Sequence, residues 1–259
     1  METLNILGII QARVGSTRLP GKVLFALNKE PVILHVYKRV HAARLIDEII
    51  VATSLEKNNL PLVRICTESD IRVFCGSEND VLDRFYQVSN ILRPKQIVRI
   101  TADCPLIDPD IIDKVIRFHL DNSNDYTSNT VVETYPDGLD VEIFTMESLS
   151  NTWENALLPS EREHVTPFLR NPKNGFKIGS VINRENLSGK RWTLDTEEDY
   201  VFIKSVFEHL YPNNNEFRMS DILSFLAKHK ELELLNSKIS RNEGYKKSFE
   251  QDKLQKKHL

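Results

Sequence analysis

Short aliphatic runs alternate with amphipathic stretches over residues 5–101, and this rhythm constrains the fold more than any other feature. The aliphatic runs have the length and composition of buried strands, and they span 5–10, 48–53, 71–75 and 96–101. The stretches between them repeat apolar residues every three or four positions, as helices that bury one face do, and they span 32–40, 60–68 and 80–92. Parallel neighbouring strands need such crossovers. The pattern therefore predicts an α/β fold with a mostly parallel, mixed sheet covered by helices on both faces.

The rhythm changes in the second half of the chain. A helix is expected at 109–121, and strands near 125–129 and 138–144 have no full helix between them, so we expect an insertion or antiparallel excursion around 122–158. The other expected elements are helices at 146–156 and 160–170, a strand at 176–182, and a short strand at 191–194 that runs into a helix beginning near 196. We interpret residues 1–235 as a single domain and 236–259 as a charged C-terminal tail that is solvated or contacts a partner.

Charge and cysteine content limit the partners and the compartment. The chain has 34 Lys and Arg against 37 Asp and Glu, a net charge of −3, which argues against a protein that holds nucleic acid by bulk charge. Its first apolar run has a strand's length and follows no basic segment, so no membrane association is expected. Cys66, Cys75 and Cys104 lie outside any CxxC spacing, which fits a reducing, cytoplasmic location.

A basic loop follows the first expected strand. Residues 11–22 include Arg13, Arg18 and Lys22 together with two glycines and two hydroxyl side chains. Ligands of parallel sheets bind beyond the carboxyl ends of the strands, where glycines let backbone N–H groups converge on an anion and three cations could neutralise a triphosphate. The loop matches neither GxxxxGK[ST] nor GxGxxG, and by composition a solvated basic loop is an equally good interpretation.

Acidic residues occur at two other expected strand ends. Asp103 follows the run at 96–101, so the sheet argument places it at the same edge as the basic loop, where a hard cation would need oxygen ligands. Asp195 lies between a short strand and a helix. Both residues also suit helix caps, and Asp195 with Glu198 could form a capping box.

Two further polar clusters stand out. Alternate residues of a strand share a face, so Asp140 and Glu142, beside Asp137, could present two carboxylates to the hydroxyls or an amine of a sugar, or simply to water. His164 lies near Arg162, and a lone histidine on a helix is usually structural or exposed to solvent.

Seven segments resemble, in order, the cytidylyltransferases that activate acidic sugars, the 3-deoxy-manno-octulosonate and acylneuraminate enzymes, and above all the spore coat polysaccharide biosynthesis protein F group. The segments are QARVGSTRLPGK (11–22), IIVAT (49–53), GSENDVLDRF (76–85), RITADCPLIDP (99–109), GLDVEIF (138–144), SEREHVTP (160–167) and WTLDTEED (192–199). The resemblance extends from residue 6 to about residue 200.

This resemblance implies a Rossmann-like nucleotidyltransferase domain that transfers CMP from CTP to the anomeric hydroxyl of an acidic sugar and releases pyrophosphate. It implies Mg²⁺ as the cofactor, held by Asp103 and Asp195, and it allows for a homodimer that uses 122–158 as an interface. By resemblance, the catalytic residues are Arg13, Arg18, Lys22 and Asp103. The expected nucleotide-binding residues are Gln11, Ala12, Arg13, Gly15, Ser16, Arg18, Lys22, Thr53, Gly76 and Ser77. The expected sugar-binding residues are Asp140, Glu142, Arg162 and His164.

The sequence departs from the family pattern at two places. It has Ala102 and Cys104 around Asp103 where the octulosonate enzymes have Gly and Glu, which bears on the sugar more than on the metal. It has Thr193 where the acylneuraminate enzymes have a further aspartate, so the number of metal ions stays open.

Two other functions are compatible with the sequence. One is a glycosyltransferase of the same fold that uses a nucleotide-sugar, for which Asp108-Pro109-Asp110 would be the Asp-x-Asp element, although a capped helix start explains this triplet more simply. The other is a catalytically silent, nucleotide-binding homologue.

Overall fold

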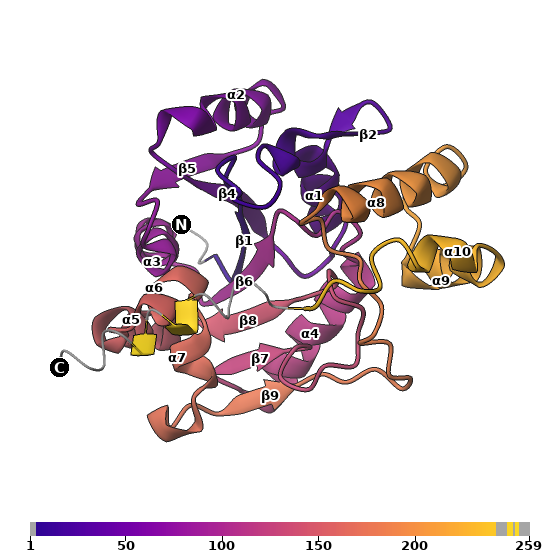
Figure 1. The fold of residues 1–259 in the computed structure, drawn as a ribbon. Coiled ribbons are helices and arrows are strands. Elements are labelled where there is room, and N and C mark those ends of the chain that lie inside the picture. The colour runs from indigo at the N-terminus through magenta and orange to yellow at the C-terminus, as the bar shows by residue number, and fades with distance from the viewer. Residues whose placement is uncertain (1–3, 242–247, 251, 254–259) are drawn as a thin grey trace.

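The structure, a computed structural model, describes residues 4–241, 248–250 and 252–253. Within these residues the main sheet has seven strands in the order β5-β4-β1-β6-β8-β7-β9 (Figure 1). Four neighbouring strands are parallel: Val73–Gly76 (β5), Glu48–Ser54 (β4), Ile6–Gln11 (β1) and Gln96–Thr101 (β6). Glu142–Thr145 (β8) is antiparallel to β6 and to Tyr126–Ser128 (β7), which pairs in parallel with Ile178–Ser180 (β9). The prediction of a mostly parallel α/β sheet is confirmed.

Helices cover both faces of the sheet because the strands are apolar on both sides (Figure 1). Ile6 and Ile10 of β1 belong to a core cluster with helices α1, α2, α4, α8 and α9, whereas Leu7 and Ile9 belong to a second cluster with α3, α5 and α7. The helices of the first cluster are Val32–His41 (α1), Leu60–Glu68 (α2), Pro109–Asn122 (α4), Glu197–Leu210 (α8) and Met219–Lys228 (α9). Those of the second are Val81–Leu92 (α3), Met146–Asn155 (α5) and Pro167–Arg170 (α7). The short helices are Pro159–His164 (α6), Lys230–Glu233 (α10), Lys22–Leu24 (η1), Lys57–Asn59 (η2) and Pro172–Asn174 (η3).

The parallel strands bring the acidic and basic segments to one edge of the sheet. Strands β1 and β6 pair in register up to Gln11 and Thr101, and the Ala102 amide then donates to the Gln11 carbonyl at 2.9 Å. The basic loop leaves β1 and Asp103 follows β6 at this edge. The amide of Leu194 donates to the carbonyl of Asp103 at 2.8 Å, which ties the segment before α8 to the same place.

Several elements differ from the sequence-based predictions. The helix expected at 160–170 is broken into α6 and α7, because Val165 has a positive φ of 70°. The segment 191–194 forms only an isolated bridge, between Arg191 and Asp137. The excursion around 122–158 is built into the main sheet, where β8 lies between β6 and β7.

A small hairpin was not expected from the sequence. Ala26–Leu27 (β2) pairs antiparallel with Glu30–Pro31 (β3) across a turn in which Asn28 and Lys29 have φ of 44° and 72°. Two consecutive positive φ values are what a two-residue hairpin turn requires.

Three described residues of the C-terminal tail pack against the body of the protein. Asn236, Ser248 and Asp252 are each no more than 4% exposed. Asp252 accepts hydrogen bonds from the amide and the hydroxyl of Ser160, at 3.0 and 2.6 Å. The expectation of a solvated tail is therefore wrong for these residues, while 242–247 and 254–259 lie outside the described residues.

Candidate active site

The basic loop and the two acidic strand-end residues meet at the carboxyl edge of the sheet. The Lys22 ammonium lies 2.8 Å from Asp103 Oδ2 and 2.7 Å from Asp195 Oδ1. Arg18 Nη2 lies 2.9 Å from the other oxygen of Asp195. Gly21, with φ of 76°, turns the chain so that η1 begins at Lys22. Four predicted site residues from three distant parts of the sequence are thus brought together.

Electrostatics favour the charged forms of this cluster. Burial lowers the pKa of Lys22, but the two carboxylates raise it more, so it lies above its usual value. Burial raises the pKa of Asp103, but the Lys22 ammonium lowers it more, and the pKa lies well below its usual range. Asp103 and Lys22 therefore stay ionised at neutral pH.

The donor set of this cluster fits a magnesium ion. Mg²⁺ usually takes one or two carboxylates from the protein and fills its remaining positions with water and substrate phosphate. Asp103 and Asp195 supply two carboxylates that already share one cation, the Lys22 ammonium. No group of three or more potential metal-ligating side chains occurs among the residues that the structure describes, so substrate oxygens would complete the shell.

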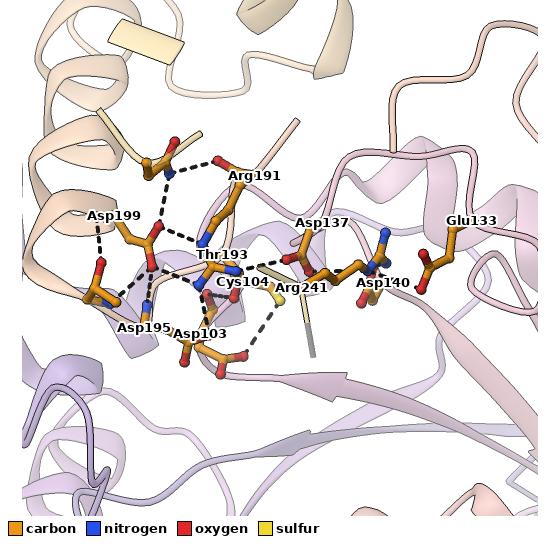
Figure 2. A network of polar contacts seen from close by, with 12 residues as sticks. Asp103, Cys104, Glu133, Asp137, Asp140, Arg191, Thr193, Asp195, Asp199 and Arg241 are labelled. Atoms are coloured by element: carbon orange, nitrogen blue, oxygen red, sulfur yellow. Dashed lines mark hydrogen bonds and ion pairs between the residues drawn. The ribbon is translucent and has the colours of Figure 1, made fainter. Parts of the chain in front are cut away.

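Asp195 is held in place by a buried network (Figure 2). Arg191 Nη2 contacts Asp195 Oδ2 at 3.2 Å and Asp199 Oδ2 at 2.9 Å, and Asp199 also accepts from the Asp195 amide at 3.0 Å. The capping box of α8 is formed by Thr196 and Asp199. The suggested capping box of Asp195 with Glu198 is therefore wrong, and the Asp195 carboxylate faces the cluster.

Two neighbouring cavities open on either side of this cluster. The first, which we call the loop cavity, measures about 370 Å³ and is lined by Gln11, Ala12, Arg13, Ser16, Arg18 and Lys22, among others. The second, the acid cavity, measures about 230 Å³, and its acidic lining residues are Asp103, Glu133, Asp137, Asp140, Glu142 and Asp195. Arginines from five positions also line the acid cavity: Arg18, Arg99, Arg170, Arg191 and Arg241. Both cavities share Arg18, Thr101, Asp103, His164 and Asp195.

Asp137 and Asp140 are two neighbouring carboxyl groups of the acid cavity (Figure 2). Burial and the neighbouring Asp140 raise the pKa of Asp137 to about 7, against the opposing effect of Arg241 and Arg191. Burial also raises the pKa of Asp140, which Arg241 partly offsets. This wall of the cavity therefore favours ligand groups that donate hydrogen bonds.

Glu142 lines the same cavity and is held by two hydrogen bonds and an ion pair. It accepts hydrogen bonds from the Tyr126 and Thr166 hydroxyls, both at 2.6 Å, and it pairs with Arg99. Burial raises the pKa of Glu142, but Arg99 and Arg170 lower it by more, so the pKa lies below its usual value and the carboxylate stays charged. Asp140 and Glu142 both line the cavity, but β8 begins only at Glu142, so Asp140 lies outside the strand that the shared-face argument assumed.

The structure separates the two predicted sugar-binding residues of α6. His164 lines both cavities, bonds through Nε2 to Ser248 Oγ at 3.0 Å, and has a pKa lowered to about 4, first of all by burial. Arg162 instead pairs with Asp80 and donates to the Trp153 carbonyl at 2.8 Å, and it is not among the described residues that line the two cavities. The expectation that Arg162 contacts the sugar therefore has no support in this geometry. Its contacts tie α6 to α3 and α5.

The nucleotide-binding residues expected outside the basic loop lie to one side of the cavities. Thr53 is fully buried in β4, and Gly76 pairs with Ser54 at the end of β5. The Ser77 hydroxyl accepts from the Asp80 amide at 3.1 Å. Gly15 and Arg13 face this side, where Arg13 lies 3.4 Å from Glu78. Contact of Thr53, Gly76 and Ser77 with a nucleobase stays a prediction.

Sequence reasoning missed most of the arginines of the acid cavity. Arg99 points from a strand, Arg170 ends α7, Arg191 lies in a loop, and Arg241 belongs to the tail. No spacing in the sequence connects these four positions. The acidic residues at 137 and 140 were the available signal, since buried carboxylates need cationic partners.

Comparisons with known proteins identify the family of this chain. A family model described as cytidylyltransferase matches residues 7–248. The spore coat polysaccharide biosynthesis protein SpsF of Bacillus subtilis is 35% identical over 79% of this chain and 87% of its own. A 3-deoxy-manno-octulosonate cytidylyltransferase of Geotalea daltonii is 30% identical over 72% of both chains.

A solved structure shows the same fold and supports the same assignment. The structure of a cytidylyltransferase from Leptospira borgpetersenii superposes with a TM-score of 0.82 and 30% identity, and the match covers 89% of this chain and 96% of that one. With a family model that spans most of its length and relatives aligned over both halves, the chain belongs to the cytidylyltransferase family and is a nucleotidyltransferase.

Proposed function

We propose that the protein transfers the cytidylyl group of CTP to the anomeric hydroxyl of an acidic sugar, giving a CMP-sugar for surface polysaccharide or glycoconjugate biosynthesis. The observation that carries this proposal is the cluster of Arg18, Lys22, Asp103 and Asp195 on the wall between two polar cavities. One cavity lies beside the basic loop, as a triphosphate requires, and the other offers hydrogen-bonding groups of both kinds, as a sugar acid requires. The similarity to the 3-deoxy-manno-octulosonate cytidylyltransferase of Geotalea daltonii supports an acidic sugar.

The proposed reaction needs positioning and charge stabilisation rather than covalent catalysis. The anomeric oxygen attacks the α-phosphorus, the bond to the bridging oxygen breaks, pyrophosphate leaves, and the hydroxyl proton is released. Arg13, Arg18 and Lys22 would bind the β- and γ-phosphates and neutralise the leaving group. Asp103 and Asp195 would hold Mg²⁺, which supplies positive charge at the α-phosphate when bound.

The glycosyltransferase alternative has less support in the geometry. The Asp108 carboxylate, the first of the Asp-x-Asp triplet, is 3% exposed and accepts from the amides of Asp110 and Met219, at 2.9 and 2.7 Å. It is a helix cap and is not among the described residues that line either cavity.

Pyrophosphate release tests the proposal directly. We expect the protein to release pyrophosphate with CTP, Mg²⁺ and at least one sugar acid from a panel that includes 3-deoxy-manno-octulosonate and N-acetylneuraminate. Repeating the panel with UTP or with nucleotide-sugars in place of CTP distinguishes the proposed reaction from that of a glycosyltransferase. Absence of CTP binding and of turnover across the panel would reject the proposal, and binding without turnover would identify a silent homologue.

Two substitutions test the residue assignments. Arg18→Ala and Asp103→Asn should each lower turnover by about 100-fold or more, because the first removes a cation that would neutralise the phosphates and the second removes a carboxylate that would hold Mg²⁺. Thermal unfolding should change little, since both side chains lie at the cavity wall. Arg117→Ala, at an exposed position of α4, is the matched control and should keep wild-type turnover. Near-wild-type turnover of either site variant would refute its assigned role.

A further inference from the structure

An arginine of the C-terminal segment completes the acid cavity. Arg241 follows α10 in the sequence, and its side chain is only 14% exposed and lines the cavity between Glu133, Asp137 and Asp140 (Figure 2). Nη2 donates to Asp140 Oδ1 at 2.8 Å. Nε lies 3.5 Å from Glu133 and 3.6 Å from Asp137, which are ion-pair distances rather than hydrogen bonds.

The segment that carries Arg241 is anchored on both sides. Before it, the buried Asn236 donates to the Arg191 carbonyl at 3.0 Å and to Asp199 Oδ1 at 2.9 Å. After it, the Ser248 hydroxyl donates to Glu163 at 2.6 Å and lines the loop cavity. The first anchor uses the backbone of Arg191 and the side chain of Asp199, two residues whose side chains also hold Asp195. The position of Arg241 is therefore coupled to the catalytic cluster.

Part of the guanidinium lacks hydrogen-bond acceptors. Among the described residues, Nε and Nη1 of Arg241 are buried and make no hydrogen bond. Buried donors without acceptors are costly, and arginine presents its donors in a fixed fork. The exposed part of the Arg241 side chain lines the acid cavity, where a ligand that offers oxygen acceptors can meet the guanidinium.

The surrounding charges indicate which oxygens fit. Three carboxylates already surround the guanidinium, so another carboxylate would meet like charges at this wall. A hydroxyl group can accept from Arg241 and donate to Asp137 or Asp140 in the same place. The wall is thus complementary to neighbouring hydroxyls of a sugar.

We propose that Arg241 is a specificity-determining residue that binds the hydroxyl-bearing part of the sugar together with Asp137 and Asp140. The inference rests on the proposed function, because it assumes that the acid cavity receives the sugar. Arg241 contributes hydrogen bonds to the sugar and none to CTP. A sugar acid that lacks the contacted hydroxyl leaves the guanidinium donors unsatisfied and is discriminated against.

Steady-state kinetics of three variants test this role. Arg241→Met removes the fork and the charge, Arg241→Lys keeps the charge, and Lys238→Ala removes an exposed cation from the same segment as a control. With the best sugar acid of the panel, KM for the sugar should rise about tenfold or more in Arg241→Met and by a smaller factor in Arg241→Lys. KM for CTP should stay within about twofold in both variants, and Lys238→Ala should match the wild type.

Analogues that each lack one sugar hydroxyl distinguish a direct contact from a structural effect. Wild-type protein should disfavour the analogue that lacks the contacted hydroxyl by about tenfold, and Arg241→Met should lose most of this discrimination. A purely structural role would lower the unfolding temperature, raise both KM values and leave the discrimination unchanged, and that result would overturn the inference. Arg241→Lys covers the case in which Arg241→Met does not fold.

The two proposals fail in different ways. If wild-type protein turns over a sugar acid and both Arg241 variants keep its KM, only the role of Arg241 is rejected. If wild-type protein turns over no member of the panel, both the proposed function and the role of Arg241 are rejected.

Discussion

Gly138 follows Asp137 of the acid cavity and lies in close contact with the backbone of Trp192. Its φ is 108°, and an added Cβ would lie 2.5 Å from the Trp192 carbonyl carbon. This close approach follows from the bridge of Asp137 with Arg191, in which the Trp192 amide donates to the Asp137 carbonyl at 2.6 Å. Only a residue without Cβ fits there.

We therefore expect Gly138→Ala to lower the free energy of unfolding by about 2–4 kcal/mol, since it combines a disfavoured φ with a backbone clash. Gly175→Ala has φ of 78° but open space, so it should cost only about 1–2 kcal/mol. Gly189→Ala, with open space and no positive φ, is the control and should change little. Urea denaturation measures all three, and equal values for Gly138→Ala and Gly189→Ala would contradict the packing argument.

Single residues show where sequence reasoning ends. Lys22, Asp103 and Asp195 could be predicted because strand ends and a recognised loop located them. Arg191 and Arg241 could not, because their partners Asp137 and Asp140 are distant in the sequence and no periodic pattern links them. Side chains that meet only through the tertiary fold carry no local signal.

At the scale of elements, Asp108 caps two helices at once. Its Oδ1 accepts from the Asp110 amide in the first turn of α4, and its Oδ2 accepts from the Met219 amide at the start of α9. The carboxylate is 3% exposed, and removing it leaves two partly buried amides without these acceptors.

Asp108→Ala should therefore lower the free energy of unfolding by about 2–4 kcal/mol, the sum of two lost caps and their desolvation. Asp108→Asn keeps one acceptor oxygen and should cost about half as much. Asp110→Ala removes a carboxylate whose side chain is 63% exposed and should cost about 0.5 kcal/mol or less. Equal losses for Asp108→Ala and Asp110→Ala in chemical denaturation would refute the double cap.

His119 joins α4 to the sheet in its neutral form. Its ring nitrogens bond to the hydroxyl of Thr127 in β7 and the side-chain oxygen of Gln96 in β6, both at 3.0 Å. Burial lowers the pKa of His119 to about 4. Between that value and about 6.5, the unfolded chain binds a proton that the folded chain does not, so stability falls as the pH drops through this window.

Replacing His119 with Gln should flatten this dependence. From pH 7 to pH 5 the wild type should lose up to about 2 kcal/mol more stability than His119→Gln, whose side chain does not titrate. Denaturation midpoints at several pH values measure the difference. Parallel pH profiles for the two proteins would show that His119 does not cause the loss.

Elements were predicted well where periodicity and length agreed, as for α2 and β6, whose bounds match the expected ranges. The helix expected at 160–170 failed because its apolar pattern continues through Val165, while the backbone turns there. The segment 191–194 resembles a strand because it is buried, but its partner is one residue of a loop. Burial and pairing produce the same apolar pattern, so sequence alone could not separate them.

At the scale of the whole molecule, the two core clusters are joined through the strands, and the site lies on their common edge. None of the helices in the described part of the chain is long and apolar enough to cross a membrane. A homodimer and a cytoplasmic location stay predictions.

Ligand binding should stabilise this whole assembly. Saturating CTP with Mg²⁺, at about 100 times its Kd, should add about 2.7 kcal/mol to the free energy of unfolding and raise the unfolding temperature. Removing divalent ions with EDTA should reduce the rise, because Asp103 and Asp195 would then face the triphosphate without the metal. Equal shifts with and without EDTA would argue against a metal at these residues. UTP at the same concentration is the control for the base.

The wall between the cavities, with Arg18, Asp103 and Asp195 exposed to both sides, also has a thermodynamic consequence. A molecule seated in either hollow alters the charges that its neighbour meets. Thermodynamic linkage makes this effect reciprocal. If the first ligand changes the affinity for the second by some factor, the second changes the affinity for the first by the same factor. The wall between the two cavities therefore couples the binding of the two ligands.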